Sequence, residues 1–310
     1  MVPEGWNLKK LGEIATTASG STPKRNIEEY WEGGSINWVA TGEIDYKPIF
    51  ESEEKITEKA VKDHSLTIFP KGSVLMAMYG QGTTRGKVGI LATEAAINQN
   101  SCAILTNPLL TISEYIYYYL EISYTALRNL SNGGGQQNLN NQLVRSFEIL
   151  LPPLPEQQKI ADILSTWDKA IEKQEALIAA KQKRKRGLMQ QLLTGKVRFK
   201  GFEGKWKRHK LKEVCEKSTP QINPSNFPQE EFEYYSIPAF QETGQPSKTL
   251  GEEIKSNKLL IESGVVLFGK LNPRILKIWK VESNSKARKL ASTEFMPLIP
   301  SSTLNLSYLY

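Results

Sequence analysis

A glycine-rich loop near residue 80 carries the side chains best suited to binding a phosphate-containing ligand. Residues Tyr79–Ile90, YGQGTTRGKVGI, place hydroxyl, amide and cationic groups among four glycines. A nucleotide-binding P-loop needs four residues between its first glycine and a Gly-Lys pair that Ser or Thr follows. Here three or five residues separate the glycines, and Val88 follows Lys87, so the P-loop pattern fails. The loop instead carries donors of the kind that contact phosphates and base edges: Gln81, Thr83, Thr84, Arg85 and Lys87.

Two further loops carry side chains that can hydrogen-bond to nucleic acid. In GSTPKR, residues 20–25, Lys24 and Arg25 can contact phosphate or guanine, and a plain turn before a strand is the alternative. In SNGGGQQNLNNQLV, residues 131–144, amide side chains can read adenine. The candidates there are Gln136, Gln137 and Asn138. This loop must also join a Tyr-rich helix to the next strand, and that role could be its only one.

The sequence offers no catalytic or metal-binding set. His64 and His209 are the only histidines, and both lie in charged stretches typical of a protein surface. Cys102 and Cys215 have no His or Cys at metal-ligand spacing, so we interpret them as buried free thiols. No Ser-His-Asp set can be assembled, and no Asp/Glu-x-Lys segment follows a strand as a nuclease would require. We therefore expect a non-catalytic chain without a metal.

Length and charge favour two domains and an anionic partner. A chain of 310 residues is long enough for two domains. Its net charge of +7 is uneven, because residues 1–154 hold 13 Lys and Arg against 16 Asp and Glu, residues 155–200 hold 11 against 5, and residues 201–310 hold 16 against 12. A basic middle and end are compatible with nucleic acid. No long apolar run and no secretory signal are present, so we expect a cytoplasmic protein without a membrane anchor.

The chain repeats itself weakly at a spacing of about 190–200 residues. The matched segments are Glu4–Ile14 with Glu203–Val214, Phe69–Gly80 with Leu260–Pro273, and Asn100–Tyr117 with Ser292–Tyr310. Within them, Trp6 pairs with Trp206, Gly72 with Gly264 and Tyr117 with Tyr310. Three matches in one order argue against chance and predict a duplicated domain. The second copy stops at Tyr310, so we expect it to lack a counterpart of roughly the last 80 residues of the first.

Residues 155–193 predict one long amphipathic helix between the two copies. Pro155 suits a first turn, where its missing N–H costs no hydrogen bond, and Gly195 predicts the stop. A helix of this length spans roughly 57 Å and must bury its apolar stripe against another long helix. The stripe consists of Ile160, Leu164, Trp167, Ile171, Ile178, Leu188 and Leu192. The basic run KQKRKR, residues 181–186, is either a solvated face or a phosphate contact.

The sequence around this helix resembles a known family. LPPLPEQQKIADIL leads into the helix, and LMQQLLTGKVRF ends it before a second Trp-containing block. Over the whole chain this arrangement resembles the specificity (S) subunit of type I restriction–modification enzymes, and the PLPEQ and LLTG segments are its most specific part. The resemblance implies two target recognition domains, each reading half of a bipartite DNA site and each followed by a long helix. In the family the two helices pair antiparallel and set the distance between the domains.

The resemblance also implies the partners. Modification subunits dock on the long helices and methylate adenine, and restriction subunits add translocation and cleavage. S-adenosylmethionine, ATP and Mg therefore belong to the partner subunits, and the chain itself needs no cofactor. Family members have a comparable glycine- and Arg/Lys-bearing loop at Tyr79–Ile90, so the resemblance implies DNA contact by this loop. In the second block, the equivalent segment Phe268–Trp279 supplies the expected DNA contacts Lys270, Asn272, Arg274 and Lys277.

We therefore predict an α+β protein. A β-rich recognition domain occupies residues 1–154, a long spacer helix lies in 155–200, and an incomplete second recognition domain occupies 201–310. The expected function is DNA recognition, with double-stranded DNA and the modification and restriction subunits as partners. The alternative is a truncated remnant that acts only as a protein-interaction module, and a stand-alone nuclease would require metal-dependent cleavage. For the missing helix we expect either the same helix of a second chain or a separately encoded fragment.

Overall fold

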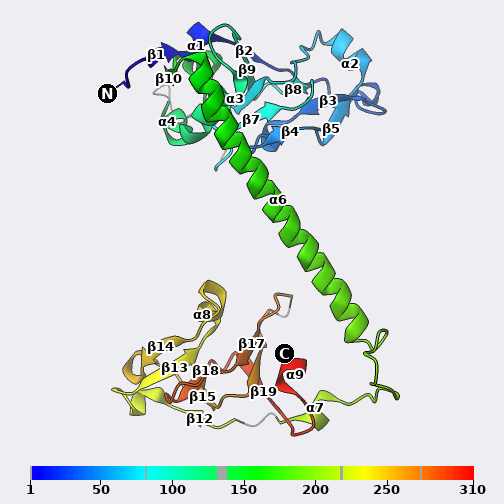
Figure 1. Cartoon of the computed structure of the whole chain (residues 1–310), viewed down its shortest axis with the longest axis vertical. Helices are drawn as coiled ribbons and strands as arrows, with labels where there is room; N and C mark the ends of the chain where they lie inside the picture. Colours follow the sequence, from blue (N-terminus) through cyan, green and yellow to red (C-terminus); the bar gives the residue numbers. More distant parts are fainter. Residues whose placement is uncertain (1, 81, 131–137, 217–218, 273) are drawn as a thin grey trace. The chain divides into compact units, whose positions relative to one another are not determined.

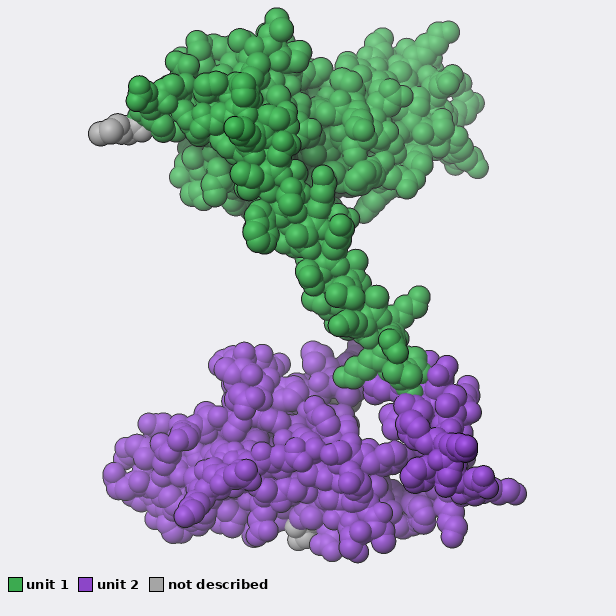
Figure 2. All heavy atoms as spheres, viewed as in Figure 1, with its two compact units in different colours: residues 1–188 green, residues 189–310 purple. Residues whose placement is uncertain are grey.

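The computed structural model describes residues 2–80, 82–130, 138–216, 219–272 and 274–310. The chain forms two compact units, Met1–Leu188 and Met189–Tyr310 (Figure 2). Both units mix strands with short helices, and one long helix stands out (Figure 1), which confirms the predicted α+β class. Among the described residues, no helix combines the length and apolar character needed to cross a membrane.

The first unit is built on a five-stranded sheet with the order β2-β9-β6-β7-β4. Its strands are β2 (Ala15–Ser19), β9 (Ser101–Thr106), β6 (Val74–Ala77), β7 (Val88–Leu91) and β4 (Pro48–Ile49). Alternate residues of a strand point to opposite faces of its sheet. In β6, Val74 and Met76 join one hydrophobic cluster, whereas Leu75 and Ala77 join another. Burial on both faces explains why this strand is a continuous apolar run in the sequence.

The same unit contains a second sheet, which has three strands. Its strands are β5 (Glu54–Ile56), β3 (Ile36–Val39) and β8 (Ala96–Ile97), in the order β5-β3-β8. Trp38, with 2% of its surface exposed, is at the centre of its core. Helix α2 (Glu58–Asp63) packs into this core through Ala60, and Thr57 caps the helix because its Oγ1 accepts a hydrogen bond from the Ala60 N–H at 3.3 Å.

Short helices and a strand pair complete this unit. The helices are α1 (Leu11–Ile14), α3 (Ser113–Ile122), α4 (Tyr124–Asn129) and α5 (Asn141–Ser146). Strand β1 (Asn7–Lys10) pairs antiparallel with β10 (Glu148–Leu151). Helix α3 buries Ile116 and Leu120 against the first sheet's cluster, so the Tyr-rich segment is a core element as well as a connector.

The long helix α6 covers Leu154–Leu192, which confirms the predicted helix to within one residue at each end. Its first turn is fixed by Gln157, a fully buried amide. The Gln157 Nε2 donates to the carbonyls of Leu110 (3.1 Å) and Pro152 (2.8 Å), and its Oε1 accepts from Thr111 Oγ1 at 2.8 Å. Gly195 follows the helix with a φ of +70°, a conformation that favours glycine and agrees with the predicted stop.

The second unit also contains two sheets. The first has the order β11-β19-β16-β17, and the second has the order β12-β15-β18-β13-β14. The strands of the first are β11 (Cys215–Glu216), β19 (Phe295–Pro300), β16 (Val265–Gly269) and β17 (Ile278–Val281). Those of the second are β12 (Gln221–Ile222), β15 (Lys258–Ile261), β18 (Lys289–Ala291), β13 (Glu231–Tyr235) and β14 (Ser247–Leu250). The helices are α7 (Leu211–Val214), α8 (Ile237–Glu242) and α9 (Leu306–Leu309).

The two units share the order of four strands, as a duplicated domain would. The order β2-β9-β6-β7 in the first unit recurs as β11-β19-β16-β17 in the second. Gly72 and Gly264 occupy equivalent turns, with φ of +88° and +89°. Each donates its N–H, at 2.8 Å, to a carbonyl of the neighbouring strand, that of Leu91 in the first unit and Val281 in the second. The second block also has its own buried core, centred on Trp279 and Phe295.

Candidate nucleic-acid interface

The predicted loop between β6 and β7 is a closed, glycine-shaped turn. At its base, the Ala77 N–H donates to the Lys87 carbonyl (2.9 Å), and the Gly86 N–H donates back to the Ala77 carbonyl (2.8 Å). Gly80, Gly82 and Gly86 all have φ between +70° and +135°. Side chains rarely adopt such backbone angles, so the glycines of the motif serve the shape of the loop.

The predicted donors of this loop have different surroundings. Thr83 is exposed and Thr84 is half-buried, while Gln81 lies outside the described residues. Lys87 pairs with Asp45 at 2.6 Å and keeps 21% of its side chain exposed. These positions leave Thr83, Thr84 and Lys87 on or near the surface, as a DNA-contacting loop requires.

Arg85 differs from the expectation of an exposed donor. Only 7% of its surface is accessible, and its Nη2 donates to the carbonyl of Arg128 in α4 at 3.3 Å. The loop folds back on α4, and this fold turns the Arg85 side chain inward. In this conformation the guanidinium hydrogen-bonds within the protein, and DNA contact by Arg85 stays a prediction.

The GSTPKR segment is fixed by a stacked arginine. The Arg25 guanidinium lies over the rings of Trp31 (4.0 Å to the centroid) and Trp38 (4.8 Å), and it binds both carboxylate oxygens of Glu54, one of them at 2.8 Å. These hydrogen bonds lower the pKa of Glu54 and raise that of Arg25. Arg25 therefore contributes to the local structure, with its side chain still 51% exposed.

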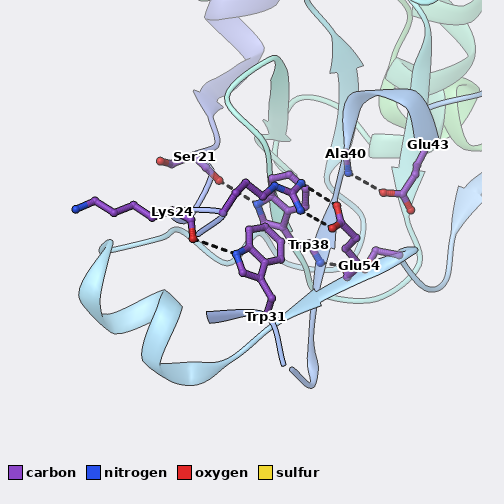
Figure 3. A network of polar contacts seen from close by, with 9 residues as sticks. Ser21, Lys24, Trp31, Trp38, Ala40, Glu43 and Glu54 are labelled. Atoms are coloured by element: carbon purple, nitrogen blue, oxygen red, sulfur yellow. Dashed lines mark hydrogen bonds and ion pairs between the residues drawn. The ribbon is translucent and has the colours of Figure 1, made fainter. Parts of the chain in front are cut away.

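Lys24 is the remaining candidate in that segment. Its carbonyl accepts a hydrogen bond from Trp31 Nε1 at 3.2 Å, and its side chain is exposed and points away from the tryptophans (Figure 3). The network around Arg25 thus fixes the Lys24 backbone and leaves the ammonium group free to meet a phosphate.

The third predicted loop is only partly described. Gln136 and Gln137 lie outside the described residues, and Asn138 is half-buried. The following amides serve the fold: Asn140 caps α5 by accepting from the Leu143 N–H at 2.9 Å, and Asn141 Nδ2 donates to Ser19 Oγ at 2.9 Å. DNA contact by Gln136, Gln137 and Asn138 stays a prediction.

In the second unit, the segment between β16 and β17 forms a loop with two exposed cations. Lys270, Asn272 and Arg274 are exposed, and Asn272 has a φ of +51°. Lys277, expected as a contact, is only 6% exposed, because its Nζ donates to the Leu271 carbonyl inside the loop at 3.0 Å. Sequence reasoning missed the apolar tip, where Leu271, Ile275 and Leu276 are 55%, 55% and 71% exposed.

A largely apolar pocket of about 750 Å³ lies where α6 leaves the first unit. It is lined by Trp6, Tyr46, Tyr115, Tyr118, Tyr119, Glu121, Ile122, Ile160, Leu164, Trp167 and Asp168. Two carboxylates lie on it: the Asp168 Oδ2 accepts from Tyr118 Oη at 2.6 Å, and burial followed by the charge of Asp168 raises the pKa of Glu121. Three members of the predicted stripe belong to this pocket, but its aromatic wall was not predicted.

Most of the stripe on α6 is exposed, including Trp167 of the pocket. Of the helix residues, only Gln157 and Ala161 are buried. Trp167 is 66% exposed, Ile171 55% and Ile178 56%. Exposed apolar residues in a row on one helix indicate an interaction surface. Leu188, 45% exposed, and the half-buried Leu192 continue the row toward the end of the helix.

Comparison with known proteins agrees with this arrangement. The family model described as the type I restriction modification DNA specificity domain matches residues 3–180. The specificity subunit of the type I restriction enzyme MjaIX from Methanocaldococcus jannaschii is 36% identical over 189 residues, covering 55% of this chain and 40% of that protein. The EcoR124I/EcoR124II specificity subunit of Escherichia coli is 29% identical over 165 residues, covering 52% and 40%. The alignments thus span well under two thirds of these curated relatives.

Two solved structures share the fold. The S subunit of a type I restriction–modification system from M. genitalium superposes with a TM-score of 0.59 at 16% identity, covering 99% of this chain and 77% of that one. A chain from a structural study of complex assembly and conformational transition in the type I R-M system gives a TM-score of 0.56 at 19% identity, covering 100% and 80%. At these identities the likeness concerns the fold alone.

Proposed function

Because the chain belongs to the family of type I restriction modification DNA specificity domains, we propose that it is the DNA-recognition subunit of a type I restriction–modification complex. The observation that supports this most is the duplicated block. Two units with one strand plan each carry a cation-bearing loop at the same place, between β6 and β7 and between β16 and β17. Two such blocks suit a bipartite site, with one half-site for each block.

The chemistry of the loops supports duplex DNA as the ligand. Exposed cations such as Lys24, Lys270 and Arg274 can neutralise phosphates, which supplies affinity. Side chains of the two loops, threonines in the first and Asn272 in the second, can then contact base edges. The loops differ in sequence, so the two half-sites should differ as well.

We propose that catalysis resides in other subunits. The modification subunits would use S-adenosylmethionine, the restriction subunits would use ATP and Mg, and this chain would need no cofactor. Within the described ranges, no three His, Cys, Asp or Glu come together as metal ligands. Because the complex would act on cellular DNA, we propose a cytoplasmic location for the chain.

Helix α6 is the proposed assembly surface, and a second copy of the chain is its proposed partner. Charge supports an antiparallel pair: residues 154–177 carry five acidic and three basic side chains, whereas residues 178–192 carry five basic and no acidic ones. Antiparallel pairing brings the acidic half of each helix beside the basic half of the other, and parallel pairing would place like charges together.

The apolar stripe supports one register for this pair. A two-fold axis between Leu177 and Ile178 places Trp167 opposite Leu188 and Ile163 opposite Leu192. The end of the partner helix then reaches the pocket that Trp6 and Trp167 line. The internal repeat offers a comparable contact between a tryptophan and the end of the helix. Trp206, the counterpart of Trp6, packs against Gly195 just after the helix, and a Cβ added to Gly195 would lie 3.1 Å from the Trp206 indole.

The test of DNA recognition is methylation mapping in a host that expresses this chain with its modification subunits. We expect one bipartite methylated motif that disappears when the chain is omitted. A complex that assembles but methylates no motif would favour the alternative, a protein-interaction module without recognition. Metal-dependent cleavage of DNA by the isolated chain would instead support a nuclease.

The test of self-association is one charge placed at the proposed axis. Ile178→Glu puts two carboxylates together in an apolar contact and should weaken association by more than about 100-fold. Ala176→Glu adds the same charge on the opposite side of the exposed helix and serves as the control. Light scattering over a concentration series measures both variants. A wild-type chain that stays monomeric throughout would disprove the pairing.

A further inference from the structure

We infer that Tyr124 and Arg128 of α4 are positioning residues that hold the loop between β6 and β7 in the shape that reads DNA. The inference rests on the proposed function, because it assigns a role in recognition to residues that would not touch DNA. It also separates two tasks within one site, since one set of residues fixes the loop backbone and another set reads the ligand.

The clamp is made of hydrogen bonds from α4 to the loop backbone. Tyr124 Oη donates to the Thr83 carbonyl at 2.6 Å, and Arg128 Nη1 donates to the Arg85 carbonyl at 3.2 Å. Arg128 Nη1 also donates to Tyr124 Oη at 2.9 Å, which links the two residues. The return contact comes from the loop, because Arg85 Nη2 donates to the Arg128 carbonyl at 3.3 Å.

Packing shows that the loop is shaped to receive this helix. A Cβ on Gly86 would lie 3.2 Å from Arg128 Cγ and 3.6 Å from Tyr124 Cδ2, and the φ of Gly86 is +87°. On its other side, Tyr124 meets the ring of Tyr46 edge-on at 6.0 Å. Asp45, the neighbour of Tyr46, holds Lys87 at the base of the loop. Helix α4 therefore holds the middle of the loop, and Asp45 holds its base.

The choice of backbone acceptors in these contacts has a consequence for recognition. Both donors of α4 bind loop carbonyls, which every residue possesses, so the clamp is independent of the side chains at positions 83 and 84. Those side chains can change without loss of the clamp. A preorganised loop also loses less conformational entropy on binding and keeps its donors in a fixed geometry.

The second unit holds its equivalent loop differently. There, Lys277 Nζ donates to the Leu271 carbonyl from within the loop itself. The α4 clamp is thus a property of the first block, and its loss should affect one half-site only.

Amide hydrogen exchange on the full chain tests the clamp directly. Tyr124→Phe and Arg128→Met should each speed exchange at the Gly86 and Lys87 amides on the order of fivefold, because each removes hydrogen bonds that oppose opening. Arg128→Lys, which keeps a donor, should restore part of the protection. Tyr30→Phe removes a similar hydroxyl bond, to Asp63 at 3.2 Å, beside the three-stranded sheet and should leave these two amides unchanged. Unchanged exchange in both clamp variants would overturn the inference.

Selection from a pool of random-sequence duplexes tests the consequence for DNA. The wild-type complex with its modification subunits should enrich two half-sites. Tyr124→Phe should lower the preference for one of them roughly tenfold while affinity for a fixed non-specific duplex stays the same. Faster exchange with an unchanged preference would refute the positioning role. If the wild type enriches no half-site, the proposed function is refuted instead. The hydrogen-exchange data would still show whether Tyr124 and Arg128 hold the loop.

Discussion

The two recognition blocks of this chain share their strands and differ in their loops. In both, the glycine turn, the central strand and the strand order agree closely, down to the 2.8 Å hydrogen bond from each turn glycine. Between β6 and β7 the loop offers threonines and is gripped by α4, whereas between β16 and β17 it offers cations beside an exposed apolar tip. A framework that is fixed by buried strands leaves such loops free to diverge, which agrees with the proposal that the two blocks read different half-sites.

A second comparison concerns an arginine cluster beside the other sheet of each block, β5-β3-β8 in the first unit and β12-β15-β18-β13-β14 in the second. In the first unit, Arg25 lies over Trp31 and Trp38 and binds Glu54. In the second unit, Arg288 lies over Phe227 and Phe232 and binds Glu230. The two arginines come from different places in the chain, so the likeness lies in the chemistry and not in the sequence. An arginine between rings keeps its charge and still packs against apolar surface.

The largest effect that distinguishes the blocks should come from their exposed loop cations. Lys24→Ala in the first block and Arg274→Ala in the second should each weaken binding to any duplex about tenfold, because each removes a phosphate contact. Each should also reduce the salt slope by about one. Fluorescence anisotropy with the assembled complex at several salt concentrations measures both quantities.

Charge alone must be excluded as the cause. Lys62→Ala on α2 and Lys248→Ala on β14 remove the same net charge at exposed positions outside the two loops. If these variants weaken binding as much as Lys24→Ala and Arg274→Ala, the loops are not the interface. If the loop substitution weakens binding in only one block, the loop of the other block does not contact DNA.

An effect of intermediate size should come from the turn glycines. Gly72→Ala and Gly264→Ala each force a side chain into a φ near +88° and should each lower the free energy of unfolding by about 1 kcal/mol. Steric clash adds little, since an added Cβ at Gly72 meets only Ser113 Oγ at 3.9 Å and one at Gly264 meets nothing within 4 Å. Exchange measured peptide by peptide reports each block separately. Gly42→Ala, at an open site without a positive φ, is the control, and unequal effects in the two blocks would weaken the structural equivalence.

The parts of the structure that local sequence patterns encode could be predicted. Pro155 and Gly195 indicated the ends of α6, and the 3–4 spacing of apolar residues indicated its stripe. The matched segments around Gly72 and Gly264 indicated the duplicated sheet. These features depend on neighbours in sequence. The α4 clamp joins Arg85 to a residue 43 positions away, and its burial could not be inferred from the composition of the loop.

The same limit applies to the pocket at the base of α6. It brings Trp6, near the start of the chain, beside Trp167 on the helix, together with tyrosines of α3. The tyrosines could be recognised in the sequence as the start of a helix. Their spacing did not indicate which face of that helix would line a pocket. Long-range packing decides that, and a single sequence does not display it.

The smallest effect should come from acid, and it sharpens the comparison of the two arginine clusters. Hydrogen bonding to arginine lowers the pKa of Glu54 and of Glu230 below their ordinary value of 4.5. A carboxylate with a lowered pKa in the folded state stabilises it above the unfolded pKa, and this stability is lost as the pH falls through the folded value. Both blocks should therefore lose stability below about pH 4.5, by less than about 1 kcal/mol for each pair, because both pairs are partly exposed.

The exposure of the pairs predicts which block loses more. The Arg288 and Glu230 side chains are 36% and 34% exposed, against 51% and 45% for Arg25 and Glu54. Water screens the first unit's pair more, so the second block should have the steeper acid dependence. Glu54→Gln and Glu230→Gln should each flatten the pH dependence of stability of their own block only. If the first block instead loses stability more steeply as the pH falls, stacking on tryptophan outweighs burial of the ion pair.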